Sequence, residues 1–158
     1  MRKRSSYRPK SVISDPLSLM RPADKRRRDM LMARFLTAIE SMARGSSPSD
    51  DEWRDLSDAV NTVETLAVHL RKLSASEVMP MVNEAIAAMV RAANRYKAGQ
   101  GMRLDSAGLK ALRDVVDVYG QCLDALTERE MAVAQAETQR RVNAVLRDRN
   151  SQRGVIAL

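Results

Sequence analysis

The apolar residues of this chain recur three and four positions apart, which is the spacing of one face of an α-helix. A first helix is expected from about Asp24 to Arg44, with Gly45 after its end, because glycine accepts the left-handed backbone that follows many helices. Its apolar face consists of Leu31, Phe35, Ala38 and Met42, with Leu36 and Ile39 beside them. No alternation typical of a strand runs longer than three or four residues.

The start of the second helix is the clearest in the sequence. Ser49 is followed three residues later by Glu52, the pattern of a capping box, and Asp50 and Asp51 complement the positive end of the helix dipole. Apolar residues then alternate at steps of three and four, the seam that packs helices at shallow angles. They are Trp53, Leu56, Val60, Val63, Ala67 and Leu70.

A third helix is expected to begin near Pro80, because proline is best tolerated at the first helical position, and Gly99 is expected to stop it. The preceding LSASEVM is then a separate short turn. A fourth helix is expected after Asp105, which can cap it. The apolar faces are Val82, Ile86, Met89, Ala93 and Tyr96 in the third helix, and Leu109, Leu112, Val116, Tyr119, Leu123 and Leu126 in the fourth.

Thr127 and Glu130 form a second capping-box pattern, so either the chain bends there or one long helix runs through these residues. The segment from there to Arg149 is helical by propensity, but its apolar stripe is thin: Met131, Ala134, Thr138, Val142 and Val145. A helix this polar packs by one narrow edge or on another subunit. The pattern therefore predicts an all-α fold, an antiparallel bundle of four to five helices over residues 24–150.

Charge divides the chain into basic ends and an acidic middle. Residues 1–34 hold 11 Lys and Arg against 3 Asp and Glu, residues 35–139 hold 11 against 16, and residues 140–158 hold 5 against 1. Three prolines and the lack of a helical period predict that residues 1–23 form a flexible basic arm. Residues 151–158 are expected to be a flexible tail.

The basic segments indicate binding to phosphate groups. Lys and Arg neutralise nucleic-acid backbones, and a tyrosine ring stacks on bases. In KRRR at 25–28 the four charges span just over one helical turn, so they cannot all face one way. The candidate nucleic-acid-binding residues are Arg2, Lys3, Arg4, Tyr7, Arg8, Lys10, Lys25, Arg26, Arg27, Arg28, Arg140 and Arg141. Binding to an acidic protein surface, or a merely solvated charge run, remain alternatives.

Nothing in the sequence indicates catalysis, a metal or a cofactor. His69, the only histidine, has no metal-ligand spacing around it and is expected to be a partly buried structural residue. The single cysteine, Cys122, lies among apolar residues and is expected to be a core thiol. It excludes an internal disulfide and favours a reducing compartment, and no membrane span or secretory leader is visible. We therefore expect a cytoplasmic protein that is not an enzyme.

Four short motifs resemble a group of short helical proteins of tailed bacteriophages and proteobacterial prophages. They are the RKRSSYRPK start, the NTVETL stretch at 61–66, Arg95–Tyr96 before a polar loop, and the late T-x-x-E at Thr127 to Glu130. The resemblance implies a phage or mobile-element origin and expression inside a bacterial host. It assigns no functional residue.

Two functions are expected from these observations. The first is a non-enzymatic accessory protein that binds DNA or RNA through basic arms on a self-associating helical body. The second is a phage protein that binds and redirects a host protein of transcription or defence.

Overall fold

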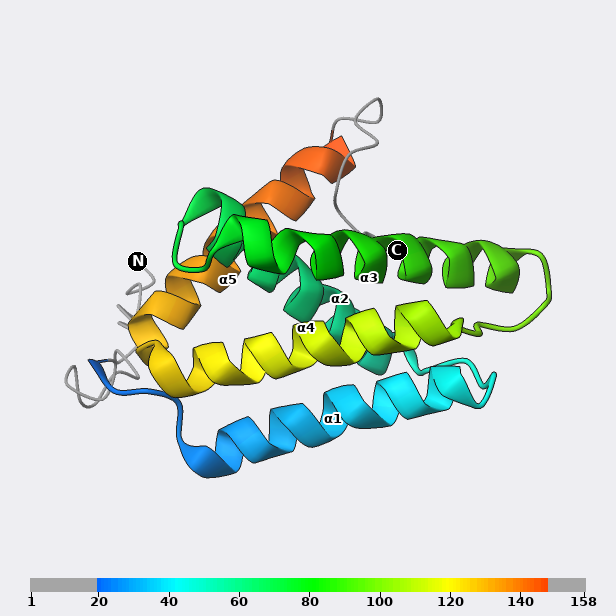
Figure 1. The fold of residues 1–158 in the computed structure, drawn as a ribbon, viewed down its shortest axis with the longest axis horizontal. Coiled ribbons are helices and arrows are strands. Elements are labelled where there is room, and N and C mark those ends of the chain that lie inside the picture. The colour runs from blue at the N-terminus through cyan, green and yellow to red at the C-terminus, as the bar shows by residue number, and fades with distance from the viewer. Residues whose placement is uncertain (1–19, 148–158) are drawn as a thin grey trace, which may run out of the picture.

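A computed structural model describes residues 20–147, which form five α-helices, one π-helical segment and no strand (Figure 1). The elements are α1 (Lys25–Ala43), α2 (Asp50–Glu64), the π-helical η2 (Thr65–His69), α3 (Ala75–Lys97), α4 (Ser106–Ala125) and α5 (Glu128–Arg147). The predicted all-α fold is confirmed. The predicted tail, and residues 1–19 of the predicted arm, lie outside the described residues.

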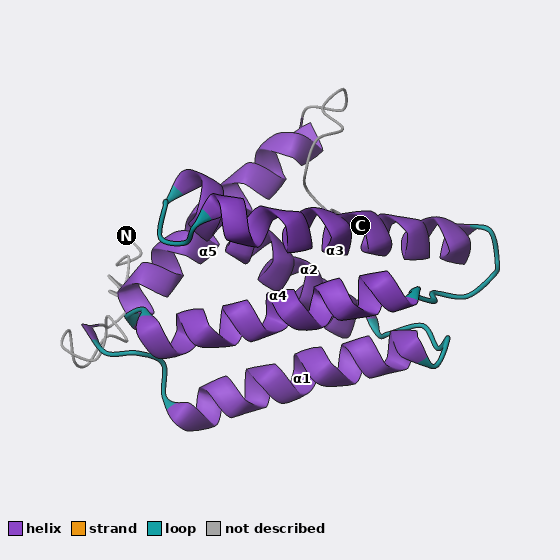
Figure 2. Cartoon of the chain, in the orientation of Figure 1, coloured by secondary structure: helices purple, strands orange, loops and turns teal. Residues whose placement is uncertain are grey.

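Three helices form a front layer, and two lie behind it. In Figure 2, α1, α4 and α3 run side by side with alternating direction, joined to the rest by short loops, and α2 crosses behind them. Helix α5 turns away from α4 and packs on α2 and η2. Between the layers, the largest fully buried side chains include Ile39, Met42, Leu56, Leu66, Met89 and Leu112.

The predicted helix starts at Ser49 and Asp105 are confirmed, and of the two alternatives left open at Thr127 the structure shows the bend. Ser49 Oγ accepts the Glu52 N–H at 3.2 Å, and the Glu52 carboxylate accepts the Ser49 N–H at 2.8 Å. Asp105 Oδ1 accepts the Gly108 N–H at 2.8 Å. The second capping box, Thr127 to Glu130, begins a separate helix, because the backbone of Leu126 is extended, with ψ 148°.

The prediction that the third helix begins at Pro80 is wrong. Helix α3 begins at Ala75, and Pro80 lies in its second turn. Val78 in the added turn is 7% exposed and packs into the core. Burial of a valine stabilises by about 1.5–3 kcal/mol, which helps to offset the backbone hydrogen bond that the proline cannot donate.

The prediction of a partly buried His69 is also wrong, because the side chain is exposed. The helical seam continues regularly to Val63 and then enters the π-helical turn η2. A π-turn holds more residues than an α-turn, so the following side chains rotate relative to the core. Val68 is consequently 43% exposed, and Leu70 is only partly buried.

None of the helices within residues 20–147 is both long and apolar enough to cross a membrane.

Candidate functional site

Basic side chains from three separate segments meet at one end of the bundle, which we call the basic end. The Glu128 N–H donates to the Arg21 carbonyl at 2.8 Å, and Arg27 Nη1 lies 3.8 Å from Glu128 Oε1. Arg129 is followed in α5 by Glu130, whose carboxylate accepts a hydrogen bond from Lys72 Nζ at 2.8 Å. The basic end comprises Arg21, Lys25, Arg26, Arg27, Lys72 and Arg129.

The four residues of KRRR divide as their helical spacing predicts. Lys25, Arg26 and Arg27 are exposed on the first turn of α1. The guanidinium of Arg28 instead lies against α4, with its Nε 2.7 Å from Asp124 Oδ1. Within residues 20–147, no carboxylate lies at ion-pair distance from Lys25 or Arg26, so both charges remain open to a phosphate.

Local acids partly neutralise the basic end. The pKa of Glu130 is lowered to about 2, first by the hydrogen bond from Lys72 and then by the Thr127 N–H and hydroxyl. Glu130 is therefore ionised at neutral pH and offsets the charge of Lys72. Arg129 between the two acids is exposed, and no carboxylate of the described residues pairs with it.

Arg140 and Arg141, the last two predicted nucleic-acid-binding residues, lie elsewhere. Arg140 is 12 residues beyond Glu128, about 18 Å along the helix, and its guanidinium contacts the Glu137 carboxylate at 2.6 and 2.8 Å. Arg141 faces the body, where its Nη2 lies 3.3 Å from Glu64 Oε2 and its side chain is 19% exposed. The structure therefore does not bring this pair to the basic end.

Arg141 belongs to a polar cluster that the sequence did not reveal. Its Nη1 donates to Thr65 Oγ1 at 2.9 Å, and the hydroxyl oxygen of Thr138 lies 2.9 Å from the same atom. These contacts fasten α5 to the π-helical turn. The one sequence signal was Thr138, a hydroxyl inside the apolar stripe of the last helix.

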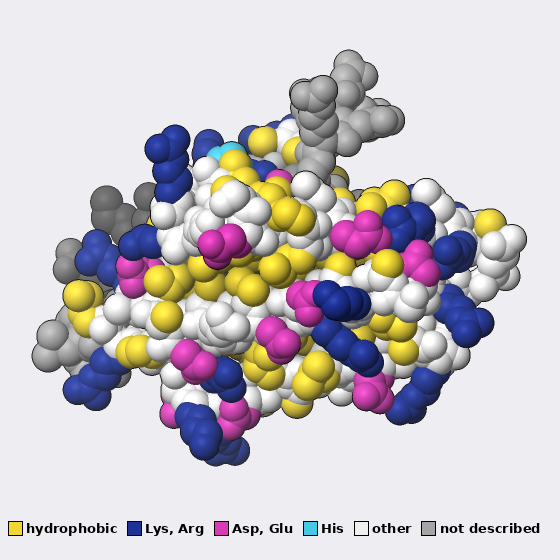
Figure 3. All heavy atoms as spheres, viewed as in Figure 1, with side chains coloured by type: hydrophobic (Ala, Val, Ile, Leu, Met, Phe, Trp, Pro, Cys, Tyr) yellow, Lys and Arg dark blue, Asp and Glu magenta, His cyan; other side chains and the backbone are white. Residues whose placement is uncertain are grey.

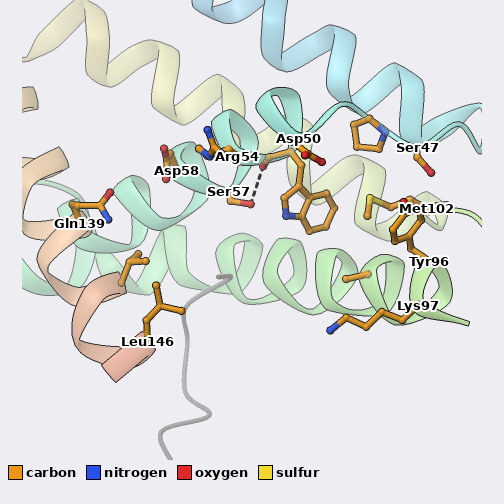
Figure 4. A pocket seen from close by; sticks show the side chains of 14 residues that line it. Ser47, Asp50, Arg54, Ser57, Asp58, Tyr96, Lys97, Met102, Gln139 and Leu146 are labelled. Atoms are coloured by element: carbon orange, nitrogen blue, oxygen red, sulfur yellow. Dashed lines mark hydrogen bonds between the residues drawn. The ribbon is translucent and has the colours of Figure 1, made fainter. Parts of the chain in front are cut away.

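A cavity of about 530 Å³ opens between α2, α3 and the last turns of α5. In Figure 4, Tyr96 and Lys97 of α3 face it from one side, Gln139 and Leu146 of α5 from another, and Asp50, Arg54 and Asp58 come from α2. Its other lining residues are Ser47, Pro48, Trp53, Ser57, Ala93, Met102 and Val142. Tyr96, predicted on the buried face of its helix, is 56% exposed because this space is open.

The carboxylates of α2 and the single thiol show no catalytic arrangement. Asp58 lies between the large cavity and a second one of about 300 Å³, and burial, followed by the nearby Asp55 charge, raises its pKa. Cys122 is 3% exposed, and burial raises the pKa of its thiol to about 11, which confirms the predicted core thiol. No group of three or more potential metal ligands occurs among residues 20–147.

Comparison with models of protein families, with curated proteins and with solved structures found no match to this chain.

Proposed function

We propose that this chain is a phage-type, non-enzymatic accessory protein that binds nucleic acid through its basic N-terminal segment and the basic end of a self-associating helical body. One observation carries the proposal. The hydrogen bond between Arg21 and Glu128 holds the root of the N-terminal segment beside Lys25, Arg26 and Arg27. The segment that precedes Arg21 in the sequence carries five Lys and Arg in its first ten residues, so the described body begins at the basic end.

This arrangement suits contact with phosphates rather than the reading of bases. Exposed Lys and Arg bind any phosphate backbone by releasing its counterions, so affinity is weakly dependent on sequence and strongly dependent on salt. The helices are long and regular, and no pair of them within residues 20–147 has the short polar recognition helix of a helix-turn-helix. Sequence-independent binding is the expected behaviour.

The test compares two double variants of the full chain. Figure 3 shows that Lys and Arg side chains also occur at the opposite end of the molecule, so charge alone does not distinguish the ends. Lys25→Ala with Arg26→Ala removes two exposed charges of the basic end. Arg103→Ala with Arg113→Ala removes two exposed charges elsewhere and serves as the matched control.

Binding of labelled single-stranded and duplex oligonucleotides is measured by fluorescence anisotropy at several salt concentrations. The basic-end variant should reduce the slope of log K against log salt by about 1.4 on single strands and about 1.8 on duplex. The control variant should leave the slope unchanged. Equal effects of the two variants, or no binding by the unmodified chain, would contradict the proposal. If the unmodified chain does not bind nucleic acid, capture of one host protein that persists after nuclease treatment would favour the alternative function, binding to an acidic surface on a host protein.

A further inference from the structure

The smaller cavity, of about 300 Å³, lies between α1 and α5, which make no contact with each other within residues 20–147. Its buried lining residues Phe35, Ala59 and Tyr119 are 3%, 1% and 4% exposed, and they give it an apolar, partly aromatic floor. The volume is at the small end of the range for ligand pockets, about 300–1,000 Å³. It therefore suits one planar ring system rather than a segment of polypeptide.

This cavity opens beside the basic end. Arg27 belongs to the basic end and also lines the cavity, and its side chain is 61% exposed. Its Nη1 lies 3.8 Å from Glu128 Oε1, too far for a hydrogen bond, so within the described residues its donors remain open to a phosphate. In Figure 1, the first turns of α1 and α5 lie at the same end of the bundle. A strand held at the basic end by its phosphates therefore passes the mouth of the cavity.

The cavity offers both a hydrogen-bond acceptor and a hydrogen-bond donor. Within the part of the chain that the structure describes, no cation lies at ion-pair distance from the Asp58 carboxylate, which lines the cavity. The Tyr119 hydroxyl accepts from Gln135 Nε2 at 3.3 Å, and its own proton has no acceptor among residues 20–147. Burial, and then the nearby Asp58 charge, raise the pKa of Tyr119, so the phenol keeps its proton at neutral pH.

We propose that this cavity takes one unpaired guanine base of a single strand whose phosphates lie on the basic end. The Watson–Crick edge of guanine presents two adjacent donors, the ring N–H and the exocyclic amine, beside a carbonyl acceptor. The Asp58 carboxylate matches the two donors, and the Tyr119 hydroxyl matches the carbonyl oxygen. Adenine, cytosine and thymine each lack one donor of the adjacent pair, so they leave a carboxylate oxygen of Asp58 without a partner.

This inference rests on the proposed function, because the basic end has to hold the strand. The basic end itself grips phosphates without regard to sequence, and the cavity adds a preference at a single position of the strand. A paired base cannot enter, because its Watson–Crick edge is occupied by the opposite base, whereas an unpaired base is free to leave the stack at low cost. The preference is therefore confined to single strands.

Oligothymidylates that carry one central guanine or one central adenine test the base preference. Fluorescence anisotropy with the unmodified full chain should show about tenfold tighter binding of the guanine strand, which is in the lower part of the range for a bidentate contact to a base. Duplexes made from the two strands should bind equally well. A strand with hypoxanthine in place of guanine lacks the exocyclic amine and should lose most of the preference.

Two matched variants assign the preference to the cavity. Asp58→Asn replaces one carboxylate oxygen by an amide donor and should abolish the preference for guanine. Asp117→Asn makes the same change of charge at an exposed residue that lines neither cavity, and it should keep the tenfold ratio. Because both variants remove one negative charge, general attraction to phosphates rises in both, and only the ratio of guanine to adenine affinity separates them. Tyr119→Phe keeps the ring, removes the hydroxyl donor and should lower the ratio.

A titration with mononucleotides tests the cavity without a strand. Gln135 lines the smaller cavity and not the larger one, so its side-chain amide reports on the smaller cavity alone. Guanosine monophosphate should shift the NMR resonances of this amide in the unmodified protein and in Asp117→Asn, but not in Asp58→Asn. Adenosine monophosphate should shift them less at the same concentration.

Equal affinity for the guanine and adenine strands would overturn the inference, as would an unchanged guanine preference in Asp58→Asn. Strands that bind with the expected salt slope but without a base preference would leave the proposed function standing and remove the base site. If no strand binds, the proposed function fails, and the Gln135 resonances decide on the cavity. A shift that depends on Asp58 would then assign the site to a free guanine nucleotide, and no shift would overturn it.

Discussion

Replacement of Gly108 by alanine should destabilise the protein, although the same change in most helices stabilises it. Gly108 lies in the first turn of α4, directly beside Ala88 of α3. A Cβ atom at this position would lie 2.4 Å from Ala88 Cβ and 2.9 Å from Asp105 Oδ1. The first contact is with a methyl group fixed to the backbone, so the two helices must move apart.

The magnitude follows from three contributions. Overpacking of a filled core costs about 1–3 kcal/mol. Displacement of Asp105, whose carboxylate caps α4 through the Gly108 N–H, costs about 1 kcal/mol. The helical preference of alanine over glycine returns up to about 1 kcal/mol. We expect a net loss of about 1–3 kcal/mol in the free energy of unfolding, measured by urea denaturation with far-UV circular dichroism.

Gly120→Ala is the matched control in the same helix. There a Cβ would lie 3.1 Å from the Cε and Sδ atoms of Met32, a flexible side chain that can move aside. The free energy of unfolding should change by less than about 1 kcal/mol. In a double-mutant cycle, Ala88→Gly should recover part of the loss caused by Gly108→Ala. A Gly108→Ala protein as stable as the unmodified chain would refute the assigned helix contact.

Two further predictions concern charges that the fold places. Arg141→Ala leaves the carboxylate of Glu64 buried without its partner and should cost about 2–4 kcal/mol of unfolding free energy. The double change Arg141→Met with Glu64→Gln removes both charges and should cost clearly less. Equal losses in the two variants would contradict a paired role for Arg141 and Glu64. The pKa of Glu130 is lowered from 4.5 to about 2, so its contribution to stability is present above the unfolded pKa and is lost as pH falls toward 2. Chemical denaturation across this range should show a shallower fall in the free energy of unfolding for Glu130→Gln than for the unmodified protein. Identical pH profiles of the two proteins would argue against the Lys72 and Thr127 contacts.

The sequence by itself determined the helices whose signals are local. Ser49 and Glu52 are three residues apart and satisfy each other within one turn, so no other part of the chain is needed to place this start. The same pattern at Thr127 and Glu130 left a bend and a continuous helix open, and the extended backbone of Leu126 decided between them. Apolar periodicity likewise located the buried faces of α2 and α4. The spacing of KRRR also predicted correctly that its residues would face different ways.

Only the tertiary structure decided which charges are free and where the body leaves space. Arg28 and Arg141 look like their basic neighbours in the sequence, but Asp124 and Glu64 reach them from other helices. The early start of α3 depends on a core that buries Val78. The cavity beside Trp53 exists because the direction of α5 after Leu126 makes it diverge from α3, and the packing of whole helices sets that direction. Contacts between residues far apart in the chain do not appear in the local periodicity of the sequence, so no local pattern could have predicted them.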